Sequence, residues 1–131
     1  MKTAADYKKK ICTLKKNVYM DVVLVERSDP RLEPSLNTVS LTFEGAEDAD
    51  PELRDLVTAK SHLSSNIINR FTHIHQSVDD VIKKQLMARR LCQKAGTCIL
   101  RCMGTDAMNA LFLARHEIDE KNWTNDHQGF M

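Results

Sequence analysis

The sequence predicts a mainly α-helical fold with at most one short β segment, near residues 18–25. Prolines and glycines, which interrupt helices, number only three and four in 131 residues. Aromatic residues, which are enriched in strands, make up only 5% of the chain. The hydrophobic fraction of 42% is sufficient for a core, and the length is that of one ordinary domain. We therefore expect one helical domain over residues 1–131.

The charge balance and the N-terminal residues narrow the class of protein. Lys and Arg total 19 and Asp and Glu total 18, whereas nucleic-acid-binding domains usually carry a clear basic excess. Residues 1–10 are polar and do not resemble a secretory signal, and no apolar run approaches the length of a membrane span. We expect a cytoplasmic protein whose partners are neither nucleic acids nor membranes. In that compartment four cysteines are more typical of thiols or metal ligands than of disulfides.

The first half of the chain predicts three helices around one β-prone run. Thr3 can cap a first helix, in which Lys8–Lys10 form a solvated face rather than a phosphate-binding patch. The valine-rich residues 18–25 predict a strand, whose pairing partner we expect outside these 131 residues. Residues 36–43 fit a helix or a strand, and Ser35 favours a helix by capping it. Asp50-Pro51 marks a third helix start.

The second half predicts a long helix followed by the cysteine-containing stretch. Ser77 is expected to cap the long helix and Gly96 to end it. Its basic residues are expected on a solvated face, with anion binding as the alternative: Lys83, Lys84, Arg89 and Arg90. A break is expected at Gly104–Asp106. A final amphipathic helix is then predicted by spacing, with these residues on one side: Met108, Leu111, Phe112, Arg115 and Ile118.

Cys98 and Cys102 are the first candidate site. If both are helical, a spacing of four places them on one face, where two thiolates can bind a soft metal or an iron–sulfur cluster. Such sites usually take four ligands, so the pair would supply half of one. The same residues also continue an apolar stripe through Met87, Leu91 and Ala95. From spacing alone, the interpretation as core residues is favoured.

His73 and His75 are a weaker candidate pair. They face one way only in an extended segment, and functional histidines usually have a carboxylate partner or a complete ligand set. Surface or hydrogen-bonded histidines are therefore the favoured interpretation.

Several short segments, in order along nearly the whole chain, carry a family resemblance. The segments are 34–37, 41–44, 58–61, 68–71, 75–80, 93–95, Cys98, 101–104, 106–107, 109–110 and 117–119. They resemble the N-terminal part of the 4-hydroxybutyryl-CoA dehydratases, which also isomerise vinylacetyl-CoA. These enzymes belong to a flavoprotein family that includes 4-hydroxyphenylacetate 3-monooxygenase.

The resemblance implies the N-terminal helical domain of an acyl-CoA dehydrogenase-like flavoprotein. It implies that Cys98 and Cys102 bind a [4Fe-4S] cluster, and so reverses the preference for core cysteines. The other ligands, a histidine and a third cysteine, would come from a later domain outside this chain, which also lacks the family's β domain and C-terminal helical domain. FAD, an acyl-CoA substrate and a homotetramer are implied for the full-length enzyme, which converts 4-hydroxybutyryl-CoA to crotonyl-CoA. The 131-residue chain alone is expected to be inactive and to hold neither cofactor.

One departure from the family pattern and two alternatives remain at this point. The family has a glutamine before the arginine of the cysteine loop, and here the residue is Leu100. The first alternative is a cofactor-free helical interaction module or remnant. The second is a flavin-dependent monooxygenase component, which the cysteine pair disfavours because that branch carries no cluster.

Overall fold

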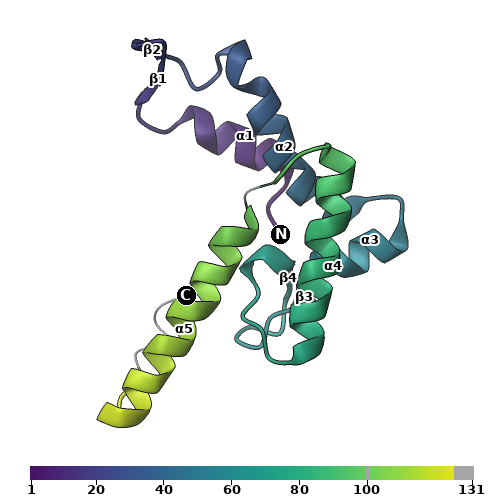
Figure 1. The fold of residues 1–131 in the computed structure, drawn as a ribbon, viewed down its shortest axis with the longest axis vertical. Coiled ribbons are helices and arrows are strands. Elements are labelled where there is room, and N and C mark those ends of the chain that lie inside the picture. Colours follow the sequence, from purple (N-terminus) through teal and green to yellow (C-terminus); the bar gives the residue numbers. More distant parts are fainter. Residues whose placement is uncertain (100, 126–131) are drawn as a thin grey trace.

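The computed structural model describes residues 1–99 and 101–125, so Leu100 and residues 126–131 lie outside the description that follows. The predicted mainly α fold is confirmed (Figure 1). The helices are α1 (Ala4–Cys12), α2 (Glu33–Glu44), α3 (Pro51–Val57), α4 (Val78–Ala95) and α5 (Arg101–Asn122). Three short 3-10 helices are η1 (Pro30–Leu32), η2 (Gly45–Glu47) and η3 (Arg70–Thr72). Within the described ranges, no helix is long and apolar enough to cross a membrane.

The β-prone run near the N-terminus pairs with itself. Strand β1 (Val18–Met20) is antiparallel to β2 (Val23–Val25). Asp21 and Val22 connect them with φ angles of 49° and 61°, the left-handed conformation that a two-residue hairpin turn requires. The expectation of a partner outside the chain was therefore wrong, because the partner strand begins only two residues further on.

A second hairpin was not predicted from the sequence. Strands β3 (Thr58–Lys60) and β4 (Ile67–Asn69) form an antiparallel pair of three residues each. Their connection is shaped by Ser61, whose Oγ accepts hydrogen bonds from the backbone N–H groups of residues 63 and 64. Because the strands are so short, they carry no detectable alternation of polar and apolar residues.

The predicted helix ends are confirmed where capping is local. Thr3 Oγ1 accepts from the Asp6 N–H at 3.1 Å, and Ser77 Oγ accepts from the Asp80 N–H at 3.2 Å. Gly96 ends α4 with φ at 68°. Helix α2 begins at Glu33, earlier than a Ser35 cap would allow. The predicted break at Gly104 is wrong, because α5 continues through it.

The hydrophobic core lies between α3, α4 and the segments that flank them. Its buried members are Leu53, Leu56, Val57, Phe71, Met87, Leu91 and Ile99. Gly45, at the start of η2, packs so closely on this core that an added Cβ would lie 2.9 Å from Val57 Cγ2. Gly104 has no such neighbour within 4 Å. Close packing therefore requires a glycine at position 45 but not at position 104.

Replacing these two glycines with alanine should have opposite effects on stability. Gly45→Ala should destabilise the chain by about 1–3 kcal/mol, because the methyl group overpacks against Val57. Gly104→Ala should stabilise it by up to about 1 kcal/mol, because alanine favours the helix and meets no neighbouring atom. Urea unfolding followed by circular dichroism measures both, and equal changes would contradict the packing argument.

Candidate functional site

The two candidate cysteines flank the junction between α4 and α5. Cys98 is exposed and lies in the connecting loop, while Cys102 is half-buried in the first turn of α5. The condition for one shared helical face, that both cysteines are helical, is not met, because Gly96 ends α4 before Cys98 is reached. The core residue of this loop is Ile99, which is only 1% exposed. The exposure of Cys98 also argues against the core interpretation.

The side chain of Arg101, the first residue of α5, holds the start of this helix against the rest of the molecule. Its guanidinium lies 4.3 Å from the ring centroid of Phe43 and 5.0 Å from that of Phe71. Its Nη1 donates a hydrogen bond of 2.6 Å to Thr42 Oγ1. Burial lowers the pKa of Arg101, an effect that the nearby Tyr7 partly opposes. The side chain thus connects the cysteine-bearing junction to α2 and η3 at once.

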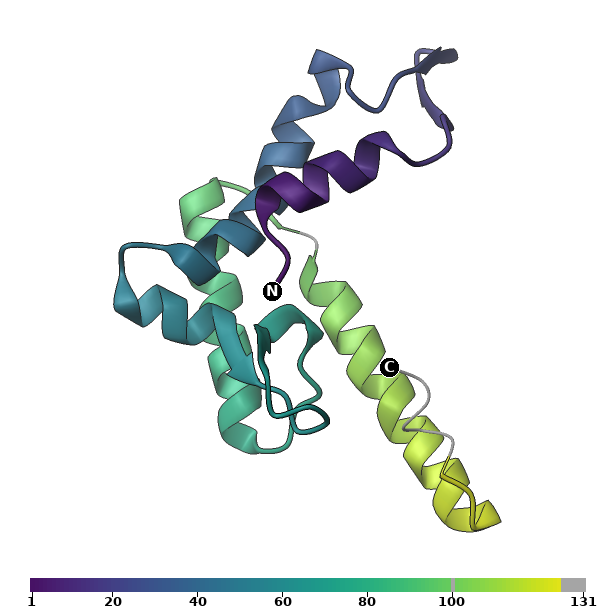
Figure 2. The ribbon, with the colours of Figure 1, turned by 180° about the vertical axis from the view of Figure 1, so that it is seen from behind.

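Helix α5 is held to the body by polar side chains spaced by four residues. After Arg101, Thr105 Oγ1 donates to the carbonyl of Phe71 at 2.9 Å. Asn109 then pairs with the extended backbone after η3: its Nδ2 donates to the carbonyl of His73 at 3.1 Å, and its Oδ1 accepts from the N–H of His75 at 2.8 Å. Beyond these contacts α5 extends away from the α3–α4 body (Figure 2).

Only part of the apolar side that the sequence predicted for α5 lies against the body: Phe112 is half-buried, and its ring lies edge-on to that of His62 at 5.9 Å. Leu111 is 55% exposed and Ile118 is 45% exposed. Spacing located an apolar stripe correctly but could not show that polar residues on another face find backbone partners. A further contact comes from Lys84 on α4, which is buried and whose Nζ lies 2.6 Å from Asp106 Oδ1. The expectation that Lys84 is solvated was therefore wrong.

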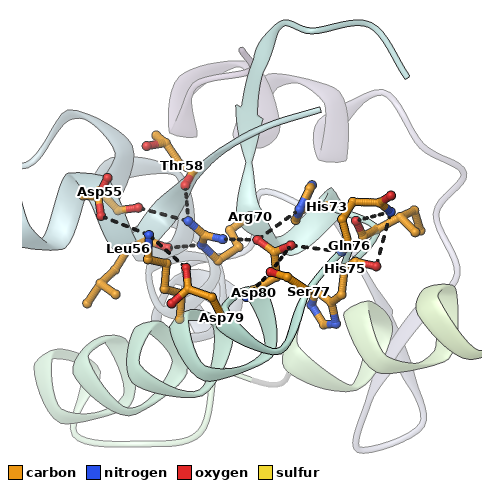
Figure 3. Close-up of polar contacts among 12 residues, drawn as sticks. Asp55, Leu56, Thr58, Arg70, His73, His75, Gln76, Ser77, Asp79 and Asp80 are labelled. Carbon is orange, nitrogen blue, oxygen red and sulfur yellow. Dashed lines mark hydrogen bonds and ion pairs between the residues drawn. The ribbon is translucent and has the colours of Figure 1, made fainter. Parts of the chain in front are cut away.

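A buried polar cluster below this junction involves Arg70, Asp80 and His73 (Figure 3). Arg70 is 4% exposed. Its guanidinium donates to the carbonyls of Leu56 at 2.7 Å and Thr58 at 2.6 Å, and lies 3.3 Å from Asp80 Oδ1. His73 Nε2 also lies 3.3 Å from Asp80 Oδ1. The cluster joins the end of α3, the start of β3 and the first turn of α4.

Burial and hydrogen bonding shift the pKa values of Asp80, in this cluster, and of the nearby His75. Burial alone would raise the pKa of Asp80, but hydrogen bonds from the Gln76 N–H and from His73 lower it overall. The pKa of His75 is lowered by burial first, and then by the nearby charge of Lys84. His73 Nδ1 and His75 Nε2 are both buried, with no hydrogen-bond partner in the described part of the chain.

The histidine pair does not form a metal site with other residues that the structure describes. Residues 1–99 and 101–125 contain no group of three or more His, Cys, Asp and Glu side chains that could hold a metal ion. The prediction that the pair is hydrogen-bonded rather than ligating fits His73, which is buried against Asp80. Sequence reasoning missed Arg70 and Arg101, because their importance comes from burial against distant backbone and aromatic groups.

The chain is similar to known proteins over nearly its whole length. A family model described as the N terminal of 4-hydroxyphenylacetate 3-hydroxylase matches residues 3–130. The chain therefore belongs to this family. It is 44% identical, over 98% of its length, to the 4-hydroxybutyryl-CoA dehydratase/vinylacetyl-CoA-Δ-isomerase of Clostridium aminobutyricum. The aligned region is 26% of that relative.

A solved structure agrees with the same relationship. The oxygen-tolerant archaeal 4-hydroxybutyryl-CoA dehydratase from N. maritimus superposes with a TM-score of 0.85 and 35% sequence identity. The match covers 96% of this chain and 25% of that protein. The chain thus spans about a quarter of the length of the relatives it matches, and the resemblance to the N-terminal part of the dehydratases is confirmed.

Removing the charge of Asp80 should destabilise the fold more than removing that of its neighbour Asp79. Asp80→Asn should cost about 2–4 kcal/mol, because it leaves buried Arg70 without its counter-charge. Asp79→Asn, in the same helical turn but with a 69% exposed side chain, should cost less than about 1 kcal/mol. Chemical denaturation at pH 7 compares the two, and equal losses would mean that the buried pair has no special role.

The stability of the chain should fall as the pH falls below about 6.5, in part because of His75. Its pKa is lowered in the folded state from 6.5, so the unfolded chain binds the proton more readily. The contribution is fully present above pH 6.5 and is lost as the pH falls through the folded pKa. His75→Gln should therefore reduce the difference in unfolding free energy between pH 7.5 and pH 5.5. An unchanged difference would contradict this assignment.

Proposed function

We propose that this chain is the N-terminal portion of a 4-hydroxybutyryl-CoA dehydratase-like enzyme. Such an enzyme would dehydrate 4-hydroxybutyryl-CoA to crotonyl-CoA and isomerise vinylacetyl-CoA. The observation that carries the proposal is the 44% identity to a dehydratase/isomerase over 98% of the chain. Because the aligned region is a quarter of that relative, the activity would require further domains, and the 131-residue chain would be inactive alone.

The chain's chemical contribution would be two thiolate ligands, from Cys98 and Cys102, to a [4Fe-4S] cluster. Three features support this role. Both cysteines are present as thiols. Cys98 is exposed, so a partner ligand can reach the same metal. Cys102 lies in the first turn of a 22-residue helix, directly after the loop that carries Cys98.

The cofactors expected in the complete enzyme are this cluster and FAD. When bound, they would supply Lewis-acid and one-electron chemistry that side chains cannot provide. The other residues of this chain would position the two cysteines and would not themselves take part in the reaction. Ile99, buried between the two cysteines, and Arg101, clamped between Phe43 and Phe71, would fix the junction and therefore the separation of the sulfurs. A homotetramer and an acyl-CoA substrate are part of the same proposal.

A second candidate is a flavin-dependent monooxygenase component, and it is favoured by the name of the matching family model. The description of that model names 4-hydroxyphenylacetate 3-hydroxylase, and the model covers residues 3–130. A component of this kind would bind flavin without iron. The two candidates therefore differ in a property that can be measured directly.

Iron content should depend on the cysteine pair. In a chimera in which this chain replaces the matching quarter of the Clostridium aminobutyricum dehydratase, anaerobic reconstitution should yield bound iron and acid-labile sulfide. Cys98→Ser or Cys102→Ser should remove most of both, because each substitution removes one ligand. Inductively coupled plasma mass spectrometry and a sulfide assay measure the loss.

The chain provides its own matched controls. Cys12 is exposed on α1, and Cys92 lies on α4 against the hydrophobic core; neither is a proposed ligand, so Cys12→Ser and Cys92→Ser should retain iron. Equal iron in all four variants, or none in the parent chimera while the unmodified relative binds it, would reject the ligand assignment. Turnover by the isolated 131-residue chain would reject the requirement for further domains.

A further inference from the structure

A pocket of about 640 Å³ lies beside the first turn of α5 and is not lined by Arg70, Asp80 or His73. It is formed by the N-terminal residues, the end of α2, strand β4 and Arg101. Its polar lining includes Lys2, Asn66 and Arg101, and its apolar lining includes Phe43, Ile67 and Ile68. No Asp or Glu is among the described residues that line it. The pocket thus combines positive charge with apolar walls.

Arg101 offers this pocket hydrogen-bond donors that the described chain leaves unused. A guanidinium has five N–H donors. The described residues give Arg101 one side-chain acceptor, the Thr42 hydroxyl bound by Nη1, and no carboxylate. The rings of Phe43 and Phe71 lie 4.3 Å and 5.0 Å from its guanidinium carbon and accept no N–H···O hydrogen bond, so other N–H donors of Arg101 stay available. Arg101 is half-buried, and partial removal of a cation from water without a counter-charge is unfavourable, a cost that an anion would relieve.

The pocket beside β3 differs from this one because carboxylates line it together with cationic side chains. It is lined by the cationic residues Lys60, Arg70 and Lys83, but also by Asp55 and Asp80. Arg70 is paired with Asp80, and Lys83 lies within ion-pair distance of Asp55. The cations of that pocket are therefore largely neutralised by the chain itself. The charge around Arg101 is not neutralised in this way.

We propose that the pocket at Arg101 binds a small oxyanion, a carboxylate or a phosphate, attached to an apolar group. The planar fork of the guanidinium suits two oxygens of such an anion. Lys2 adds positive charge at the same site, and Asn66 provides an amide donor. Phe43, Ile67 and Ile68 contact the apolar part of the ligand. Cation–π contacts with Phe43 and Phe71 hold the guanidinium in place before the ligand arrives, which reduces the entropic cost of binding.

The proposal is tested by titrating the chain with phenyl phosphate, benzoate and inorganic phosphate at constant ionic strength. Chemical shifts of backbone amides and of arginine Nε–H groups report the binding. We expect saturable binding, tighter for phenyl phosphate than for inorganic phosphate because of the apolar walls. Arg101→Met should weaken binding about ten- to a hundredfold, the range for a charge-assisted hydrogen bond. Arg89→Met, at an exposed position on α4, is the matched control and should leave binding unchanged.

A second variant separates binding from folding. Lys2 precedes α1 and makes none of the contacts that hold α5, so Lys2→Met should fold and weaken binding several-fold. Carboxylate and phosphate are distinguished by the relative affinities of benzoate and phenyl phosphate. The proposal is overturned if no probe binds saturably, or if Arg101→Met binds as the parent does. Should Arg101→Met not fold, unchanged binding by Lys2→Met overturns it. Absence of binding in the chimera with the remaining three quarters of the relative also overturns it.

Discussion

The hydrogen bonds between the polar face of α5 and the backbone around η3 determine where the cysteine-bearing junction lies. Thr105 and Asn109 bind backbone groups of Phe71, His73 and His75 rather than other side chains. A backbone carbonyl can accept only along a few directions, so such contacts fix both the position and the rotation of a helix. A purely hydrophobic contact, which is non-directional, would leave the rotation of α5 less defined.

That docking surface depends in turn on Arg70. The segment from Asn69 to His75 contains only one turn of 3-10 helix, so its own backbone hydrogen bonds do not hold it rigidly. Arg70 ties it to α3 and β3 through carbonyl groups, and to α4 through Asp80. Phe71, the next residue, has its side chain in the core, its ring against Arg101 and its carbonyl bound to Thr105. Core packing and α5 docking therefore meet at adjacent residues.

The sequence predicts this fold well where the determining interaction is local. Thr3, Ser77 and Gly96 cap helices by bonds or backbone angles within a few residues, and all three were identified from residue type and spacing. The second hairpin and the docking face of α5 could not be identified in this way. The hairpin strands are only three residues long, and Asn109 finds its partners 34 and 36 residues away. Their signal lies in tertiary contacts, which single-sequence patterns do not contain.

The same distinction explains the geometry of the C-x-x-x-C stretch. Its spacing suggested a helical face, but the residues between the cysteines decide the outcome. Ile99 enters the core, and Arg101 is held by two aromatic rings and a hydroxyl. These two anchors use the inward side of the stretch and leave Cys98 exposed. The two cysteines are therefore presented from a loop and a helix start rather than from one helix. The anchors inside the stretch, more than the cysteine spacing itself, decide how the pair is presented.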